Sequence, residues 1–311
     1  MKHTKADNVN GWLIVDKPCG MGSTEVVGKT RWLMHANKNG HTGTLDPFAS
    51  GVLPIAFGEA TKLVPFVTDG KKEYEFIVKW GEQTVTDDTD SEVVARCEKI
   101  PTHAEILAAI PHFVGKITQI PPAYSAIKIK GQPAYKLARK GQEVTIPPRE
   151  IEIYNLELLE EYADSAKFRV ECSKGTYVRT LGKDLALFLG TLGHLIMLRR
   201  TKCGIFNTKH TILLENLEKM EYVEKRRKLL LSIETSLRGI AEIAVSEEDA
   251  KKLSMGQSIS PKNYDAEPSE CVAAYFHDCL IALVRIDERK ISPIRVFNLD
   301  EKRNYKDVDY K

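Results

Sequence analysis

The stretch His41-Thr42-Gly43-Thr44-Leu45-Asp46-Pro47-Phe48-Ala49-Ser50-Gly51-Val52-Leu53-Pro54 is the most informative part of the chain. It places one carboxylate, that of Asp46, in a run of glycines, prolines and small residues that has no helical or strand pattern. The glycines permit backbone angles closed to other residues, and the prolines stiffen the loop and exclude a helix. The stretch predicts a rigid loop that holds a reactive Asp, and an ordinary turn begun by Asp-Pro is the alternative.

Length and composition limit the classes of protein to consider. The chain has 311 residues, 42% of them hydrophobic, which is enough for one large domain and a small one. Its longest apolar runs fall far short of the roughly 20 residues that cross a bilayer, so no membrane segment is expected. The first ten residues lack the features of a secretory signal and of a transit peptide, which predicts a cytoplasmic protein.

The cysteines and histidines give no sign of a metal site. The six cysteines contain no Cys-x-x-Cys pair, and the eight histidines form no metal-spaced cluster with them. Neither a zinc site nor a disulfide scaffold is indicated, and the thiols read as buried or incidental.

The charges are more informative in their distribution than in their sum. The formal net charge is only +2, but basic residues gather at 71–72, between 128 and 140, at 199–202 and at 225–228. Such clusters can follow an RNA phosphate backbone, or they can be solvated helix faces. Charge alone leaves both interpretations open.

Hydrophobic periodicity places the chemically useful residues on predicted elements. A strand at 12–15 leads to a helix for which Ser23 looks like the N-cap, and this helix leads to the Asp46 loop. From Glu73 strict alternation predicts a half-buried strand with Tyr74 at its leading end. A strand, the turn at 174–175 and a helix from 180 place Arg179 where a turn enters a helix.

Other catalytic motifs fail on spacing. The segment 22–30 ends like a phosphate-binding P-loop, but its glycines are separated by five residues instead of four, and Gly28-Lys29-Thr30 falls inside the predicted helix. Glu59 is the nearest second acid that the sequence offers for a glycosidase pair, and no Gly-x-Ser-x-Gly elbow supports a Ser-His-Asp triad. What remains is an Asp, a Tyr, an Arg and dispersed basic residues among aromatics, a set suited to handling a nucleobase, because aromatics stack bases and cations hold phosphates.

Five ordered motifs over about two hundred residues give the chain a family resemblance. It closely resembles the TruB family of tRNA pseudouridine-55 synthases from about residue 10 to 210. The matching stretches are Asp16-Lys17-Pro18, Gly40–Pro47, Ile120–Lys128 followed by Ala134–Gly141, Ser173–Arg179 and Leu198–Thr201.

The resemblance implies an enzyme that converts a uridine in the T-loop of tRNA to pseudouridine without cofactor or metal. Asp46 matches the family nucleophile, and whether it attacks the ribose or the base stays open. A tRNA-binding chaperone without catalysis is the alternative function.

The resemblance also assigns substrate-binding roles. Tyr74 matches the tyrosine that stacks on the extruded base, and Arg179 would pair with the nucleophile. Tyr177 and Leu198 match positions that pack around the target nucleotide. His41 matches the residue that wedges into the T-loop and takes the place of the flipped nucleotide. Lys17-Pro18 reads as a buttress beneath the site.

The implied fold is α+β, with a mixed, largely antiparallel sheet. The catalytic domain would span residues 1–238, with an insertion at about 121–145 that resembles the thumb of the stand-alone bacterial enzymes. Residues 239–300 read as a small β-rich module, compatible with the family's PUA-like RNA-binding domain, and 301–311 as a polar tail. The expected partner is the T-arm of tRNA, recognised by a monomer without guide RNA.

Overall fold

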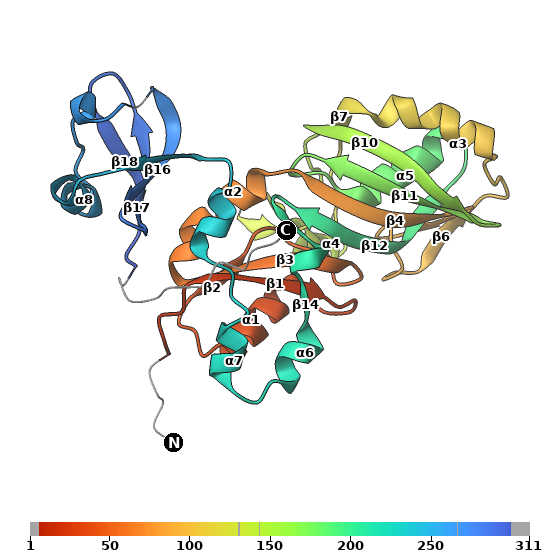
Figure 1. Cartoon of the computed structure of the whole chain (residues 1–311). Helices are drawn as coiled ribbons and strands as arrows, with labels where there is room; N and C mark the ends of the chain where they lie inside the picture. Colours follow the sequence, from red (N-terminus) through yellow and green to blue (C-terminus); the bar gives the residue numbers. More distant parts are fainter. Residues whose placement is uncertain (1–5, 130, 143, 266, 300–311) are drawn as a thin grey trace.

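The computed structural model describes residues 6–129, 131–142, 144–265 and 267–299, so the expected tail at 301–311 lies outside the described residues. A large mixed sheet with helices around it forms the body of the molecule, and a smaller sheet forms a separate C-terminal module (Figure 1). The mixed α+β class expected from the sequence is confirmed.

The large sheet is mostly antiparallel. Its described strands lie in the order β14-β1-β3-β12-β4-β11-β10-β7, with β2 paired to β3 and β13 paired to β12. The β1–β14 and β3–β12 pairs are parallel. Their bounds are β1 Gly11–Lys17, β2 Asn39–His41, β3 Ser50–Phe57, β4 Lys72–Trp80, β7 Gly115–Gln119, β10 Arg149–Glu161, β11 Ser165–Cys172, β12 Gly193–Cys203, β13 Phe206–Asn207 and β14 Ile212–Leu213.

Strand β4 confirms the alternation predicted from the sequence. Phe76, Val78 and Trp80 are buried, and Tyr74 lies near the start of the strand. Strands β11 and β12 flank β4, so its side chains enter the core of the body. The register places Tyr74 opposite Arg200, which brings two motifs from distant parts of the sequence together.

Short helices surround the sheet. The α-helices are α1 Ser23–Leu33, α2 Val64–Asp69, α3 His103–Ala109, α4 Ala134–Ala138, α5 Val178–Phe188, α6 Leu214–Lys219, α7 Val223–Arg227 and α8 Glu247–Ser254. The 3₁₀ turns are η1 Gly58–Leu63, η2 Ile110–Phe113, η3 Thr208–His210, η4 Ile233–Leu237 and η5 Pro261–Asn263. Helix α5 packs closely on β12, because a Cβ at Gly182 would lie 2.6 Å from the Leu195 side chain. No helix in the described ranges is long and apolar enough to span a membrane.

The start of α1 corrects one prediction. Gly22, not Ser23, is the N-cap, and no side chain caps this end of the helix. The Ser23 hydroxyl instead accepts a hydrogen bond from the Leu45 N–H and donates one to the Leu45 carbonyl, both at 2.8 Å. A tertiary contact has therefore replaced the local cap. Residues 28–30 lie inside α1, which confirms the rejection of a P-loop.

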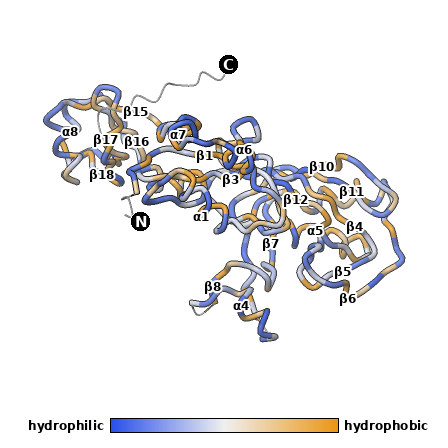
Figure 2. The backbone as a smooth tube through the Cα atoms, turned by 90° about the horizontal axis from the view of Figure 1, so that it is seen from below, coloured by the Kyte–Doolittle hydropathy of each residue, from blue (hydrophilic) through white to orange (hydrophobic). Residues whose placement is uncertain are grey.

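Two further parts of the chain project from the body. Strands β5 Glu82–Thr84 and β6 Val93–Arg96 form a hairpin. Strands β8 Lys128–Ile129 and β9 Gln132–Pro133 precede α4 in an excursion that stands apart from the sheet in Figure 2. This excursion lies in the segment where the sequence predicted an insertion.

The C-terminal module is a four-stranded sheet in the order β15-β16-β17-β18, accompanied by α8. Its strands are β15 Ala241–Ala244, β16 Ser269–Phe276, β17 Cys279–Ile286 and β18 Ile291–Val296. One face belongs to the same buried cluster as Trp12 and Leu63 of the body, through Leu280, Leu283 and Phe297. The module is therefore packed on the body through a shared apolar core.

Candidate active site

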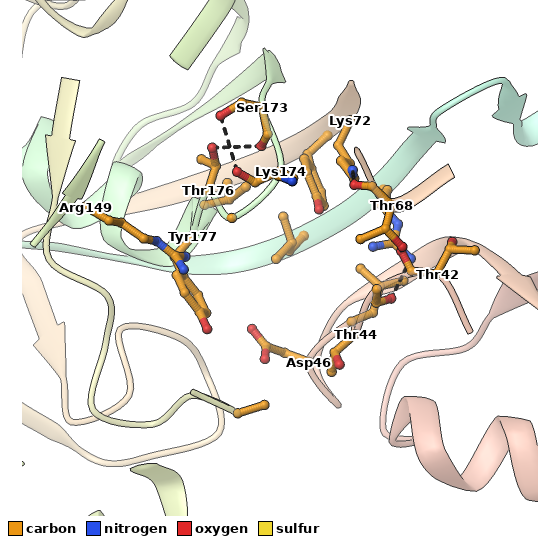
Figure 3. Close-up of a pocket in the computed structure, with 18 residues that line it drawn as sticks. Thr42, Thr44, Asp46, Thr68, Lys72, Arg149, Ser173, Lys174, Thr176 and Tyr177 are labelled. Carbon is orange, nitrogen blue, oxygen red and sulfur yellow. Dashed lines mark hydrogen bonds between the residues drawn. The ribbon is translucent and has the colours of Figure 1, made fainter. Parts of the chain in front are cut away.

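A cavity of about 260 Å³ lies where the Asp46 loop meets β4, β12 and the segment that enters α5 (Figure 3). Figure 3 shows Asp46 and Tyr177 facing the same space from opposite sides. The lining residues are Thr42, Gly43, Thr44, Leu45, Asp46, Thr68, Lys72, Tyr74, Ala126, Arg149, Ser173, Lys174, Gly175, Thr176, Tyr177, Val178, Leu198 and Arg200.

The Asp46 loop is held from below by buried polar contacts. The Lys17 ammonium donates to the carbonyls of Pro18, Met21 and Pro47 at 2.9, 2.7 and 3.2 Å. Burial lowers the pKa of Lys17 to about 8. Ser23 holds the neighbouring residue Leu45 as described above. These contacts give Lys17 the supporting place beneath the loop that the sequence predicted.

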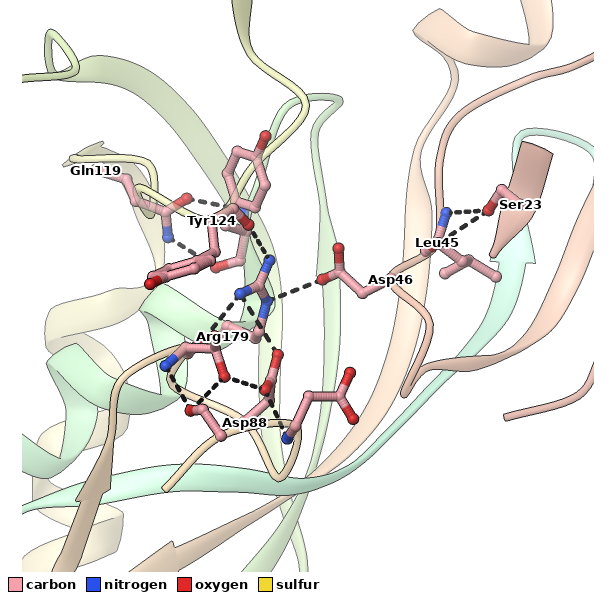
Figure 4. Close-up of polar contacts among 11 residues, drawn as sticks. Ser23, Leu45, Asp46, Asp88, Gln119, Tyr124 and Arg179 are labelled. Atoms are coloured by element: carbon pink, nitrogen blue, oxygen red, sulfur yellow. Dashed lines mark hydrogen bonds and ion pairs between the residues drawn. The ribbon is translucent and has the colours of Figure 1, made fainter. Parts of the chain in front are cut away.

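Asp46 forms an ion pair with a buried arginine. Arg179 Nε donates to Asp46 Oδ2 at 2.8 Å, and the Arg179 side chain is only 3% exposed, against 29% for Asp46 (Figure 4). The other nitrogens donate to the carbonyls of Thr86 and Tyr124 at 2.8 and 2.9 Å, and Nη1 lies 3.4 Å from Asp88 Oδ2. All three nitrogens of the Arg179 guanidinium therefore have acceptors, and Nε is held against the Asp46 carboxylate.

Tyr74 and Arg200 form the floor of the cavity. Burial raises the pKa of Tyr74 to about 12, although the neighbouring Arg200 acts in the opposite direction. Arg200 is buried and donates to the carbonyls of Val52 and Gly43 at 2.7 and 3.2 Å. Leu198 lies two residues earlier on β12 and adds an apolar wall. The floor is therefore a protonated phenol beside a fixed cation.

His41 lies beside the loop and is not among the residues that line the cavity. It ends β2, and its Nδ1 accepts a hydrogen bond from the Gly43 N–H at 3.1 Å. Burial lowers the pKa of His41, and the charge of Arg200 acts in the same direction. The imidazole is therefore neutral at pH 7.

The side chains around the cavity limit the reactions that it can support. The carboxylate of Asp46, which is paired with Arg179, lines a cavity of about 260 Å³ together with Tyr74 and Tyr177. Within the described residues, no group of three or more His, Cys, Asp or Glu side chains could hold a metal ion. A carboxylate is among the side chains that can act as a nucleophile, and tyrosine rings can stack on an aromatic base.

Comparisons with known proteins place the chain in a family. Residues 31–178 match the model of the TruB family pseudouridylate synthase N-terminal domain, and residues 179–238 match that of the tRNA pseudouridylate synthase B C-terminal domain. The chain is 43% identical over 307 residues to tRNA pseudouridine synthase B of Caulobacter vibrioides, covering 96% of this chain and 99% of that protein. The chain belongs to the TruB family. It is accordingly a pseudouridylate synthase, an isomerase.

Other relatives of this TruB-family chain also match it over most of their length. The tRNA pseudouridine synthase B of Agrobacterium fabrum is 46% identical over 303 residues, covering 94% of this chain and 96% of that protein. Among solved structures, a chain of a Cbf5-Nop10-Gar1 complex superposes with a TM-score of 0.70 at 25% identity, covering 93% of this chain and 84% of that one. A chain of an H/ACA RNP bound to a substrate RNA superposes at 0.69 with 23% identity, covering 95% of this chain and 87% of that one, which shows the fold alone.

The TruB-family site contains residues that the sequence reasoning missed. The sequence assigned no role to Asp88, which lies among other acids at 87–90, and Lys72 entered only as part of the basic pair at 71–72. Both are buried beside or in the site. Arg149 drew no attention, because a single Arg at the start of a strand carries no local signal. Only the order of strands in the sheet could have placed it near the cavity.

Proposed function

We propose that this TruB-family enzyme converts uridine 55 in the T-loop of tRNA to pseudouridine, with Asp46 as the nucleophile. The observation that carries the proposal is that Asp46 lines the cavity and is held there by an ion pair with the buried Arg179. The names of the relatives, tRNA pseudouridine synthase B, support tRNA as the substrate. The enzyme would act in the cytoplasm.

The proposed reaction rearranges one nucleotide without adding or removing atoms. The bond between uracil N1 and ribose C1′ breaks, the base rotates, and a bond forms between C5 and C1′. The proton leaves C5, and N1 gains a proton. Asp46 forms a covalent bond to the nucleotide that breaks again within the same cycle, and Arg179 holds the Asp46 carboxylate in a fixed orientation.

The remaining residues would bind and expose the nucleotide. Tyr74 would stack on the base, and its pKa of about 12 keeps the phenol protonated at neutral pH, so that it is a hydrogen-bond donor. Tyr177 and Leu198 would pack on the same nucleotide from the facing wall. His41 would wedge into the T-loop, and a neutral imidazole can enter a base stack without desolvating a charge.

We propose a division of labour between the parts of the chain. Residues 1–238 would form the catalytic domain, the excursion at about 121–145 would act as a thumb on the RNA, and residues 239–300 would be a PUA-like RNA-binding module. The shared apolar core would hold this module in one place relative to the site. The protein would act as a monomer and recognise tRNA directly, without guide RNA.

Tritium release tests the proposal. Purified protein is mixed with unmodified tRNA transcript labelled at uridine C5, with a chelator present and nucleotides absent. Wild-type protein should release label from uridine 55, and Asp46→Asn should release none. Asp164→Asn, which removes an exposed carboxylate far along the sequence from the loop, should match wild type.

Three outcomes contradict parts of the proposal. Binding of tRNA without release would refute catalysis and favour a chaperone. Release by Asp46→Asn at the wild-type rate would refute the nucleophile. Undiminished release from a transcript with cytidine in place of uridine 55 would refute the target position.

A further inference from the structure

Arg149 lines the cavity, and two of its buried nitrogens have no hydrogen-bond partner among the described residues. Among the described residues, the buried side-chain N and O atoms without a hydrogen-bond partner are Ser125 Oγ, Thr180 Oγ1, and Nε and Nη2 of Arg149. Arg149 lines the cavity, and Ser125 is adjacent to the lining residue Ala126. Buried donors without partners are rare and costly, and a missing ligand is one of their ordinary causes.

The guanidinium of Arg149 is nevertheless held in a defined position. It stacks on the Tyr177 ring at 4.8 Å from the ring centroid, and a Cβ at Gly175 would lie only 3.5 Å from its Cζ (Figure 3). Gln119, the strand partner of Arg149, binds the Tyr177 N–H and carbonyl at 2.8 and 3.1 Å. Strand β10 and the segment before α5 therefore fix both the cation and the ring beneath it.

The nearby carboxylates are already engaged. Asp46 is paired with Arg179 at 2.8 Å, and Glu150 faces Lys116 at 3.6 Å. No acid within the described ranges forms an ion pair with Arg149. The counter-ion for this guanidinium must therefore come from outside the described chain.

We propose that Arg149 binds a phosphodiester group of the RNA strand next to the target nucleotide. The inference rests on the proposed function, because a strand that extrudes a nucleotide into the cavity brings its flanking phosphates to the rim. A planar guanidinium matches a phosphate with two parallel hydrogen bonds. Nη1 is not among the sealed nitrogens, so a phosphate reaches the guanidinium through Nη1, and the second hydrogen bond forms when RNA binding opens the way to Nη2.

The salt dependence of tRNA binding tests this role, because loss of a phosphate contact lowers the slope of log Kd against log salt. We expect Arg149→Gln to raise Kd about tenfold and to lower the slope by about 0.7, the value for one contact to a single strand. Arg149→Lys should keep the wild-type slope, since it retains the charge. Lys116→Gln removes an exposed cation from the adjacent strand and should leave the slope unchanged.

A neutral linkage locates the contact. Transcripts with one methylphosphonate beside uridine 55 should lose about tenfold in affinity for wild-type protein at one linkage. Arg149→Gln, or the equally uncharged Arg149→Met if the first variant does not fold, should lose less at that linkage than wild type, whereas Arg149→Lys should lose as much as wild type. An unchanged salt slope in Arg149→Gln, or equal losses in variant and wild type at every linkage, would overturn the assignment. Tritium release by wild type is scored separately, so a failure of the proposed function is recognised by itself.

Discussion

Removal of Arg179 should destabilise the fold far more than removal of Asp46, although the two form one ion pair. The Arg179 side chain is 3% exposed and serves two carboxylates, Asp46 at 2.8 Å and Asp88 at 3.4 Å. Arg179→Gln leaves Asp88, which is 5% exposed, without its cation. Asp46→Asn removes a group that is 29% exposed and leaves Arg179 paired with Asp88.

The two costs can be estimated from this geometry. A buried charge left without its partner costs about 3–5 kcal/mol, so Arg179→Gln should lower the free energy of unfolding by that amount. In Asp46→Asn the amide oxygen remains an acceptor near Arg179 Nε, so the free energy of unfolding should fall by no more than about 1.5 kcal/mol. The difference of at least about 1.5 kcal/mol corresponds to a shift of at least roughly 0.5 M in the urea midpoint at an m-value of about 3 kcal/mol/M.

Urea unfolding followed by circular dichroism measures both variants against wild type. Arg169→Gln is the matched control, because Arg169 also faces two carboxylates, Glu75 at 3.1 Å and Glu157 at 3.4 Å, but is 39% exposed. Its cost should stay below about 1 kcal/mol. Equal midpoints for Arg179→Gln and Arg169→Gln, or a larger loss in Asp46→Asn than in Arg179→Gln, would refute the reasoning.

Three further predictions concern the support of the loop. Gly51→Ala should destabilise the protein by more than about 3 kcal/mol, because φ is +103° and a Cβ would lie 2.2 Å from a backbone oxygen of β12. Gly28→Ala, in open space on α1, should instead stabilise it by about 0.5–1 kcal/mol. Thermal melts compare the two variants with wild type. The fold lowers the pKa of His41, so on acidification the unfolded chain takes up a proton at this residue first, and the free energy of unfolding should fall as pH drops below about 6.5. His41→Gln should flatten the plot of unfolding free energy against pH in this range. Identical plots for the variant and wild type would contradict the prediction. Ser23→Ala removes both hydrogen bonds to Leu45 and should lower kcat with little change in KM; steady-state tritium release measures the two constants, and a rise in KM alone would count against a role in holding the loop.

The local sequence predicted the structure correctly where the residues of a single strand or helix determine it. Alternation from Glu73 to Trp80 predicted β4 and the place of Tyr74, because a half-buried strand carries its period in its own residues. The prediction that Ser23 is an N-cap was wrong because a contact distant in sequence determines the position of its side chain. Its hydroxyl is used by Leu45, 22 residues away, and a propensity rule sees only the neighbouring turn.

The resemblance of the motifs to a known family predicted more of the site than hydrophobic periodicity could. Asp46 and Arg179 are 133 residues apart in sequence, yet their side chains meet at 2.8 Å, as the motif comparison predicted. Asp88 and Arg149 escaped notice, since an acid within a run of acids and an Arg at the start of a strand resemble ordinary surface residues. The order β12-β4-β11-β10 brings Arg149 to the cavity, and that order is a property of the whole sheet.

The stiffness of the Asp46 loop has a different origin from the one that its composition suggested. Pro47 restricts the backbone of the loop, but Pro54 lies inside strand β3, where the sequence predicted no strand. The loop is held in place by Lys17 beneath Pro47 and by Ser23 beside Leu45. Burial of the Lys17 charge opposes folding, as its pKa of about 8 records, and this cost weakens as pH rises from about 8 to 10.5. A fold that keeps such a charge beneath one loop gives up stability there, which is expected where a carboxylate must stay in position against a bound substrate.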